Sequence, residues 1–140
     1  MKHFIFICLF FCCIACEENK SVDPTLMPEV TMTGANTFGC VIDGWVFASG
    51  RWGLPVAEFI QLEDSSSMNV SVKVGFDSFL SFTIANPRQG ETVPYTNVSF
   101  DNQRMGGGTV HITRMSDGVF SGTFDGDRVK KGRFDLRYKE

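Results

Sequence analysis

Few side chains in this sequence have the chemistry of a catalytic or metal-binding site. A hydroxyl or thiol nucleophile needs a base beside it, and beyond the first fifteen residues the only histidine is His111. It lies in a Thr-His-Thr segment of alternating polarity, which favours an exposed position on a strand. Zinc normally takes several His and Cys ligands, and His111 with Cys40 is too small a set. We therefore expect no catalytic residue, no metal site and no cofactor.

Two other segments could bind ions, but each is better explained as a connection between strands. Asp125-Gly126-Asp127 with Asp117 offers oxygen ligands for calcium, yet the spacing lacks the closing glutamate of an EF-hand loop. Gly106-Gly107-Gly108 could form an anion-binding nest, but no helix start or lysine accompanies it. The catalytic pair of a glycoside hydrolase is recognised by the distance in space between its two carboxyl groups, and sequence spacing does not give that distance.

Two aromatic residues are candidates for contact with a ligand. Trp52, in Ser49-Gly50-Arg51-Trp52-Gly53, and Tyr95, after Pro94, are the candidates for exposed loop positions, where their rings could stack on a sugar. Core packing or anchoring of the loop is nevertheless the favoured interpretation of both residues. Trp45, inside a hairpin, is expected in the core.

The first fifteen residues have the composition of a secretory signal peptide. Lys2 and His3 are followed by an almost unbroken apolar run that ends at Ala15. The run is shorter than the roughly 20 residues needed to cross a bilayer, and polar residues begin at Glu17. A buried helix or strand is the alternative, but the terminal position and basic start favour a cleaved signal over residues 1–15.

Cys16 is expected to carry lipid. Cys13-Ile14-Ala15-Cys16 resembles the lipobox of bacterial lipoproteins, although leucine is usual where Cys13 stands. The resemblance implies cleavage after Ala15, a diacylglyceryl group on the Cys16 thiol and acylation of the new amine. Two or more acyl chains are enough for stable anchoring. The alternative is a disulfide, but the only other mature cysteine, Cys40, lies in an apolar stretch that predicts a buried free thiol.

Residues 16–37 are expected to form the lipidated cysteine and a flexible tether, because the segment is polar and shows no periodicity. Glu17-Glu18 resembles the surface-export signal of Bacteroidetes lipoproteins, with a solvated linker as the alternative. Loss of the leader leaves 12 basic and 16 acidic residues, a net charge of about −4. This balance predicts no nucleic-acid partner and leaves membrane contact to the lipid.

Residues 38–140 have the pattern of a single all-β domain. Phe38–Ile42 and Trp45–Ala48 flank Asp43-Gly44, a pair that favours a two-residue hairpin turn. Residues 54–62 also fit a helical spacing, but their surroundings favour a strand. Further alternating segments are 70–76, 80–84, 109–113, 120–124 and 133–139. We expect about eight or nine strands in an antiparallel β-sandwich or a small β-barrel.

Both ends of the domain resemble a known group of proteins. Thr33-Gly34-Ala35-Asn36-Thr37-Phe38-Gly39-Cys40-Val41-Ile42-Asp43-Gly44, Ser121-Gly122-Thr123-Phe124 and Gly132-Arg133-Phe134-Asp135-Leu136-Arg137-Tyr138 are similar to segments of small Bacteroidetes lipoproteins of unknown function. The resemblance implies a lipid-anchored β-domain and transfers no catalytic residue. The motifs themselves suit turns and strands, with Arg133 and Asp135 placed to pair with charges on neighbouring strands.

Together these features predict an outer-membrane-anchored lipoprotein, periplasmic or surface-exposed, whose non-enzymatic β-domain binds a glycan or an envelope protein. Loops around Trp52, Tyr95 and the triple glycine are the expected contact surface. One alternative is a small carboxylate-based hydrolase of envelope polysaccharide. Another is a structural subunit of an envelope assembly, which a large exposed apolar patch would favour.

Overall fold

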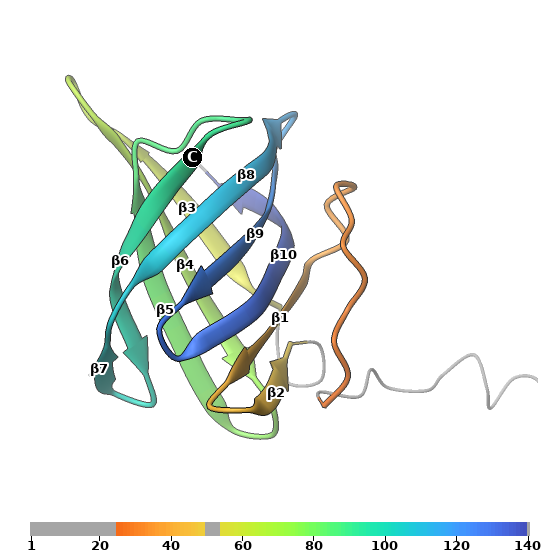
Figure 1. Ribbon diagram of the computed structural model, residues 1–140. Coiled ribbons are helices and arrows are strands. Elements are labelled where there is room, and N and C mark those ends of the chain that lie inside the picture. Colours follow the sequence, from red (N-terminus) through yellow and green to blue (C-terminus); the bar gives the residue numbers. More distant parts are fainter. Residues whose placement is uncertain (1–24, 50–53, 140) are drawn as a thin grey trace, which may run out of the picture.

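The computed structural model describes residues 25–49 and 54–139, and these residues form ten β-strands and no helix (Figure 1). The predicted all-β fold is confirmed, and residues 54–62 contain a strand as expected. Within the two described ranges no helix could cross a bilayer. The strands are β1 (Thr37–Ile42), β2 (Trp45–Ala48), β3 (Val56–Gln61), β4 (Ser66–Val74), β5 (Ser78–Ala85), β6 (Thr92–Phe100), β7 (Gln103–Met105), β8 (Gly108–Ser116), β9 (Val119–Gly126) and β10 (Val129–Lys139).

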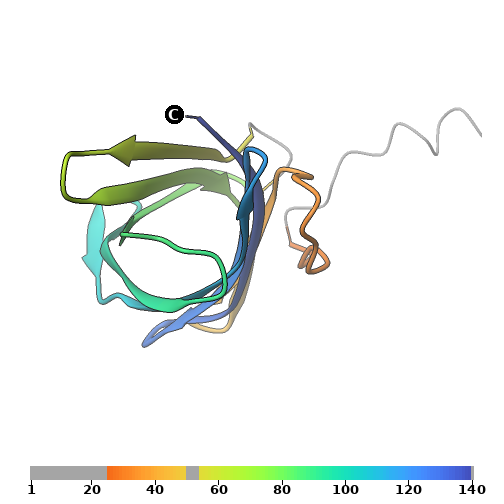
Figure 2. The same ribbon diagram turned by 90° about the horizontal axis from the view of Figure 1, so that it is seen from above.

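Seven of these strands close into a barrel (Figure 2). The order around the ring is β10-β3-β4-β5-β6-β8-β9, and β9 pairs with β10 to complete it. Neighbouring strands are antiparallel except β10 and β3, which run parallel. That seam is short, because it pairs only Tyr138 with Ala57 and Lys139 with Glu58. Of the two predicted architectures, the domain therefore adopts the barrel.

The β1–β2 hairpin lies beside the first half of β10, next to the seam. Its turn has positive φ at Asp43 (51°) and Gly44 (86°), as a type I′ turn requires, so the predicted hairpin is confirmed. The Gly75 amide donates to the Ala48 carbonyl (2.9 Å), which ties β2 to the β4–β5 turn. The hairpin therefore extends the wall at the end of the barrel that is lowest in Figure 1, called here the lower end.

The barrel interior is filled with apolar side chains. The ring of Phe124 lies 5.4–5.7 Å, centroid to centroid, from those of Phe38, Phe82 and Tyr95. Cys40 is also buried and has no disulfide, so the predicted buried free thiol is confirmed. Burial raises the pKa of Cys40 to about 12, and the thiol is therefore protonated at neutral pH.

Two aromatic residues expected to be buried are exposed. Trp45 is 74% exposed, because it begins β2, which among the described strands pairs only with β1 and is not covered by another of them. Phe76 was predicted in a strand with one buried face. Instead Gly75 (φ 61°) begins the β4–β5 turn and leaves Phe76 63% exposed. Both side chains lie at the lower end, beyond the packed interior.

Residues 31–36 lie along the outside of β10 and are held there by Asp135, which is buried (Figure 1). The Asp135 carboxylate accepts six hydrogen bonds of 2.5–3.3 Å. The donors are the hydroxyls of Thr31, Thr33 and Ser121 and the backbone amides of Thr33, Gly34 and Ala35. Burial alone would raise the pKa of Asp135, but these hydrogen bonds hold it well below its ordinary value.

This arrangement corrects two predictions. The flexible tether expected up to Thr37 is wrong for residues 31–36, because Asp135 fixes residues 31–35 to the barrel and the Arg137 amide donates to Asn36 Oδ1. The expected pairing of Asp135 with charges on neighbouring strands is also wrong, because its partners are neutral hydroxyls and amides. An outward-facing carboxylate on β10 thus fastens an additional segment to the wall.

Candidate functional site

The outer face of β4, β5 and β6 carries short polar side chains. Strand alternation directs Val70, Val72, Leu80 and Phe82 into the core, where all are buried. The residues between them face outward and are half-buried or exposed. We call this surface the polar face; its members are Asn69, Ser71, Ser81, Thr83, Asn97 and Ser99.

Strand register places these polar side chains side by side. Ser71 and Ser81 are direct partners across β4 and β5, and Ser81 is in turn opposite Ser99 on β6. The Thr83 hydroxyl donates to Asn69 Oδ1 across the same pair of strands (2.9 Å). The outcome is an array of hydroxyl and amide groups, each able to donate and accept hydrogen bonds.

A β-bulge in β6 adds Asn97 to this face. The register shifts between Ser81 and Thr83, whose partners on β6 are Ser99 and Thr96. Asn97 has φ of 53°, a conformation that asparagine tolerates. As a result two successive residues, Thr96 and Asn97, are exposed between buried neighbours. The bulge therefore directs an additional amide side chain outward.

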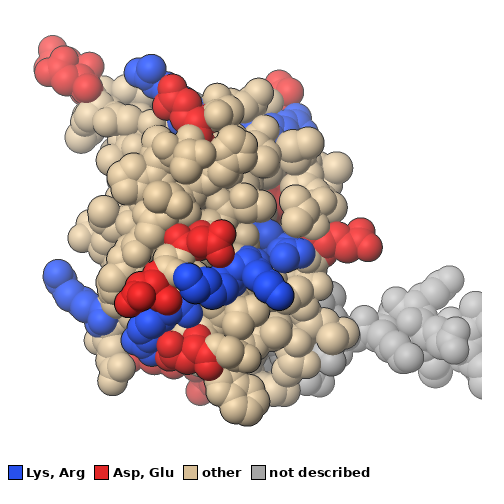
Figure 3. Space-filling view, viewed as in Figure 1, with Lys and Arg blue, Asp and Glu red and all other residues tan. Residues whose placement is uncertain are grey.

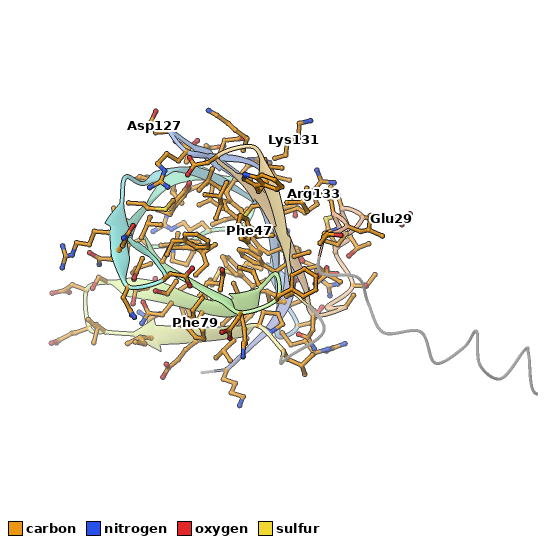
Figure 4. All side chains as sticks on the ribbon, turned by 90° about the horizontal axis from the view of Figure 1, so that it is seen from below. Glu29, Phe47, Phe79, Asp127, Lys131 and Arg133 are labelled. Atoms are coloured by element: carbon orange, nitrogen blue, oxygen red, sulfur yellow. The ribbon has the colours of Figure 1, made fainter. Side chains whose placement is uncertain are left out.

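The polar face ends in a groove near the lower end of the barrel. The groove has a volume of about 610 Å³, within the range of small-molecule sites. Phe79 is 53% exposed, is the cross-strand partner of Lys73 and lies on the barrel wall in the view from below (Figure 4). The lining residues are Lys73, Asp77, Ser78, Phe79, Ser81, Ser99, Asp101 and Asn102.

The β6–β7 turn holds the aromatic residue of this groove in place. Asp101 and Asn102 have φ of 50° and 67°, which gives a type I′ turn. Asp101 Oδ1 accepts the Phe79 amide (2.8 Å), and the Asp101 amide donates to the Phe79 carbonyl (2.9 Å). On the other side of the groove, Lys73 Nζ lies 3.5 Å from Asp77 Oδ1. Phe79 is therefore an exposed ring on a backbone fixed by two hydrogen bonds.

These groups suit a neutral, hydroxyl-rich ligand. The ring of Phe79 offers an apolar platform, while serine, asparagine and aspartate side chains around it can bond to hydroxyl groups. The groove carries two acidic side chains and one basic side chain, Lys73, so it offers no concentrated positive charge for an anion. On the side shown in Figure 3, acidic and basic side chains are interspersed over the lower half of the surface.

The predicted site residues do not meet in this groove. Cys16 and Trp52 lie outside the described residues. The selection of Tyr95 as a ligand contact is wrong, because Tyr95 is in β6 and is 1% exposed. Core packing, the favoured interpretation, is confirmed. Burial is the main cause that raises its pKa to about 12, and among the described residues its hydroxyl has no hydrogen-bond partner. Tyr95 is thus a core residue.

The error over Tyr95 has a local cause. Proline is rare within a sheet, and Pro94 therefore suggested a loop. Pro94 immediately precedes Tyr95, the first residue of β6 that pairs with β5, so the missing amide proton of Pro94 breaks no bond to that strand. β6 was therefore missed, and with it one third of the polar face. The alternating polar residues of β4 and β5 were the sequence signal for the rest of that face.

The remaining candidates stay apart from the groove. His111 is exposed on β8, as predicted, and its Nδ1 lies 3.0 Å from the Thr92 hydroxyl. Asp117 and Asp125 occupy opposite ends of β9, so they do not form one ion site. No group of three or more metal-ligating side chains occurs among residues 25–49 and 54–139.

Gly107 and Gly108 have a structural explanation. A Cβ on Gly108 would lie 1.9 Å from the Asp125 carbonyl oxygen, and one on Gly107 would lie 2.1 Å from that of Tyr95. Side chains at these positions would therefore collide with neighbouring backbone. Glycine is required for the close approach of β6, β8 and β9.

Comparisons of the chain with protein-family models, with curated proteins and with solved structures each found no match.

Proposed function

We propose that this chain is a lipid-anchored protein of the cell envelope whose non-enzymatic β-barrel binds a neutral polysaccharide along the β4–β6 polar face. Cys16 carries the lipid after cleavage behind Ala15, and the outer membrane is the expected location. The proposal keeps the anchor predicted from the sequence and moves the contact surface from Trp52 and Tyr95 to Phe79 and the polar face.

The observation that carries the binding proposal is the exposed Phe79 ring at the end of a row of hydroxyl and amide side chains. An exposed aromatic ring on a fixed backbone provides contact area at little entropic cost, and serine and asparagine provide adaptable hydrogen bonds. The row continues from the groove along β4–β6, which suits an extended chain better than a compact metabolite.

Calorimetric titration tests the groove. The probes are oligomers of glucose, mannose and N-acetylglucosamine, and the protein is the full chain with Cys16→Ala to keep it free of lipid. We expect at least one oligomer to bind, and Phe79→Ala to weaken it about tenfold through loss of ring contact. Leu62→Ala is the matched control, because Leu62 is 60% exposed in the β3–β4 turn at the opposite end. Equal binding by wild type and Phe79→Ala would refute the assignment.

The anchor has its own test. Intact mass, membrane fractionation and protease shaving of whole cells are measured for wild type and Cys16→Ala. A lipidated, membrane-bound wild type and a soluble variant are expected. Shaving of the wild type would place the domain on the cell surface, as the Glu17-Glu18 pair suggests, and protection would place it in the periplasm. An unlipidated wild type would refute the anchor.

A hydrolase remains the second candidate, because two carboxylates, Asp77 and Asp101, line the same groove. Two carboxyl groups flanking a glycosidic bond are the usual catalytic pair. Binding is favoured because Asp101 already accepts a backbone amide and Asp77 lies beside Lys73. Release of reducing sugar ends that is abolished by both Asp77→Asn and Asp101→Asn, with folding intact, would establish hydrolysis instead.

A further inference from the structure

The lower end of the barrel presents an apolar surface that the proposed groove does not use. We call it the apolar end and define it as Trp45, Val46, Phe47 and Phe76. Trp45 begins β2, Phe76 lies in the β4–β5 turn, and the two side chains are 74% and 63% exposed. Phe47 is partly buried, packs edge-on against Phe100 at 5.1 Å between ring centroids, and lies over the lower opening of the barrel (Figure 4).

Core packing does not account for this exposure. The interior above the apolar end is already filled, and Phe47 covers it. Trp45 and Phe76 therefore extend away from the barrel, with a shallow hollow between them. Large aromatic side chains that are exposed together are costly in water and mark a surface that meets an apolar partner.

The position of the chain beside the hollow identifies that partner. Thr25, the first described residue, lines the same hollow as Trp45 and Phe76. Only nine residue steps separate Thr25 from Cys16, so whatever their conformation the two Cα atoms are at most about 32 Å apart. A lipid on Cys16 therefore confines the apolar end to a thin layer above the membrane, where its effective concentration at the bilayer surface is high.

We propose that the apolar end docks on the surface of the bilayer that holds the Cys16 lipid, with Trp45 and Phe76 inserted at the level of the headgroups. The docking rests on the proposed lipidation. Tryptophan is enriched at membrane interfaces because its ring is apolar and its N–H is polar. A bilayer is also the one apolar partner that a lipidated chain always has within reach.

Charge at this end indicates which force drives the docking. Arg128 pairs with Asp43 in the neighbouring turns, and Lys73 lies 3.5 Å from Asp77. Lys131 and Asp127 also lie at the rim of this end (Figure 4). Basic side chains here are thus accompanied by acidic ones, and attraction to anionic lipid is weak. Insertion of the two aromatic rings carries the contact, which predicts little dependence on salt or on lipid charge.

Docking would also orient the binding groove. Asp77 and Ser78 line both the hollow at the apolar end and the groove beside Phe79. The groove would therefore lie just above the headgroups, and the polar face would extend from it away from the membrane along β4–β6. A polysaccharide bound there would be held close to the membrane surface.

Fluorescence of the full lipidated protein tests the docking. The protein is inserted into phosphatidylcholine vesicles with acyl chains brominated near the headgroups, and bromine quenches an indole only on contact. Trp52→Phe leaves Trp45 as the single indole, since the sequence has two tryptophans. We expect Trp45 emission to shift to shorter wavelength and to fall about twofold relative to unbrominated vesicles, at low and high salt alike.

Two matched reporters make the test specific. In a chain with Trp45→Phe and Trp52→Phe, Phe76→Trp places an indole at the apolar end and Leu62→Trp places one at the opposite end. Phe76 and Leu62 are similarly exposed, at 63% and 60%, so both substitutions are compatible with folding. We expect quenching of the first reporter and none of the second.

Each other outcome would overturn the docking in a recognisable way. Protein that floats with the vesicles but shows unquenched Trp45 keeps the anchor and refutes the docking. An intact mass without lipid on Cys16 removes the confinement and refutes docking and anchor together, while sugar binding by the groove is judged separately. A shift of Trp45 emission without vesicles, together with a dimer in sedimentation, would assign the apolar end to a second copy of the chain.

Discussion

Two walls of the barrel follow the same strand pattern but use their outer faces differently. On β9 and β10, the outward-facing partners Ser121 and Asp135 are buried beneath residues 31–35. On β5 and β6, the outward-facing partners Ser81 and Ser99 remain partly exposed. Strand alternation directs a polar side chain outward on both walls. On the β9–β10 wall, the Asp135 carboxylate accepts hydrogen bonds from residues 31–35 and thereby holds that segment against the barrel.

The comparison indicates where sequence changes should affect folding and where they should affect binding. The β9–β10 wall holds residues 31–35 through the buried side chain of Asp135. Arg133 adds a hydrogen bond to the Pro28 carbonyl, and the Arg137 amide donates to Asn36 Oδ1. The β4–β6 wall carries no such covering segment among the described residues. We therefore expect substitutions on the first wall to change stability and substitutions on the second to change ligand affinity.

The largest effect is expected from Asp135→Ala. It leaves the amides of Gly34 and Ala35 and the hydroxyl of Ser121 without their acceptor. Hydrogen bonds to a charged group contribute about 1.5–3 kcal/mol each, and they are only partly additive. We expect the free energy of unfolding in urea to fall by about 3–5 kcal/mol. A loss below about 1 kcal/mol would show that residues 31–35 do not depend on this carboxylate.

Acid should weaken the same contact progressively. The pKa of Asp135 is lowered in the folded state, so the folded state binds its proton less readily than the unfolded state. Its contribution is complete above the unfolded pKa of about 4 and is lost as the pH falls toward the folded pKa, by about 1.4 kcal/mol per pH unit. Unfolding free energies measured between neutral pH and pH 2 should show this slope, and Asp135→Asn should flatten it.

A smaller effect is expected from Gly122→Ala, also on the β9–β10 wall. A Cβ at Gly122 would lie 2.5 Å from the His111 carbonyl oxygen and 2.9 Å from the Phe134 ring. Overpacking of this kind costs about 1–3 kcal/mol, measurable as a lower urea midpoint. Gly106→Ala is the control, because a Cβ there meets nothing within 4 Å. Equal stability of the two variants would contradict the close packing of β8 against β9.

The smallest effect on folding is expected from Ser81→Ala on the polar face. Ser81 is only partly buried and its hydroxyl has no hydrogen bond with the described residues, so the change in unfolding free energy should stay within about 0.5 kcal/mol. The affinity of the Ser81→Ala protein for a sugar oligomer should nevertheless fall, because Ser81 lines the groove. A destabilised Ser81→Ala protein would mean that the β4–β6 face is structural, like the wall opposite.

Local chemistry made part of this fold predictable. Asp43-Gly44 supplies the positive φ angles of its turn from two adjacent residues, so the hairpin follows from the sequence alone. β6 was missed because Pro94 and the bulge at Asn97 interrupt its alternation. In the sequence, Asp135 occupies an outward-facing position of an alternating strand, which is typical of an exposed charge. The amides of Gly34 and Ala35 that bond to it and cover it are about 100 residues away in the sequence.

The candidate groove was less predictable than the strands. It joins Lys73 of β4, Phe79 of β5 and Asp101 of the β6–β7 turn, which only the pairing of three strands brings together. Sequence reasoning selected Tyr95 by its type and its neighbouring proline, but the ring faces the core. The residue type and the neighbouring residues can identify a candidate. Whether its side chain faces the core or the solvent depends on the strand register, which sequence alone does not give.

Backbone NMR of the Cys16→Ala protein during titration with the tightest-binding sugar oligomer tests the central claim most directly. The proposed function predicts shifts of amide signals along β4, β5 and β6, largest at Phe79, Ser81, Ser99 and Asp101, with the β9–β10 wall unchanged. Shifts centred on β9, β10 or residues 31–36, or an absence of shifts with every oligomer, would contradict the assignment of the polar face as the binding surface.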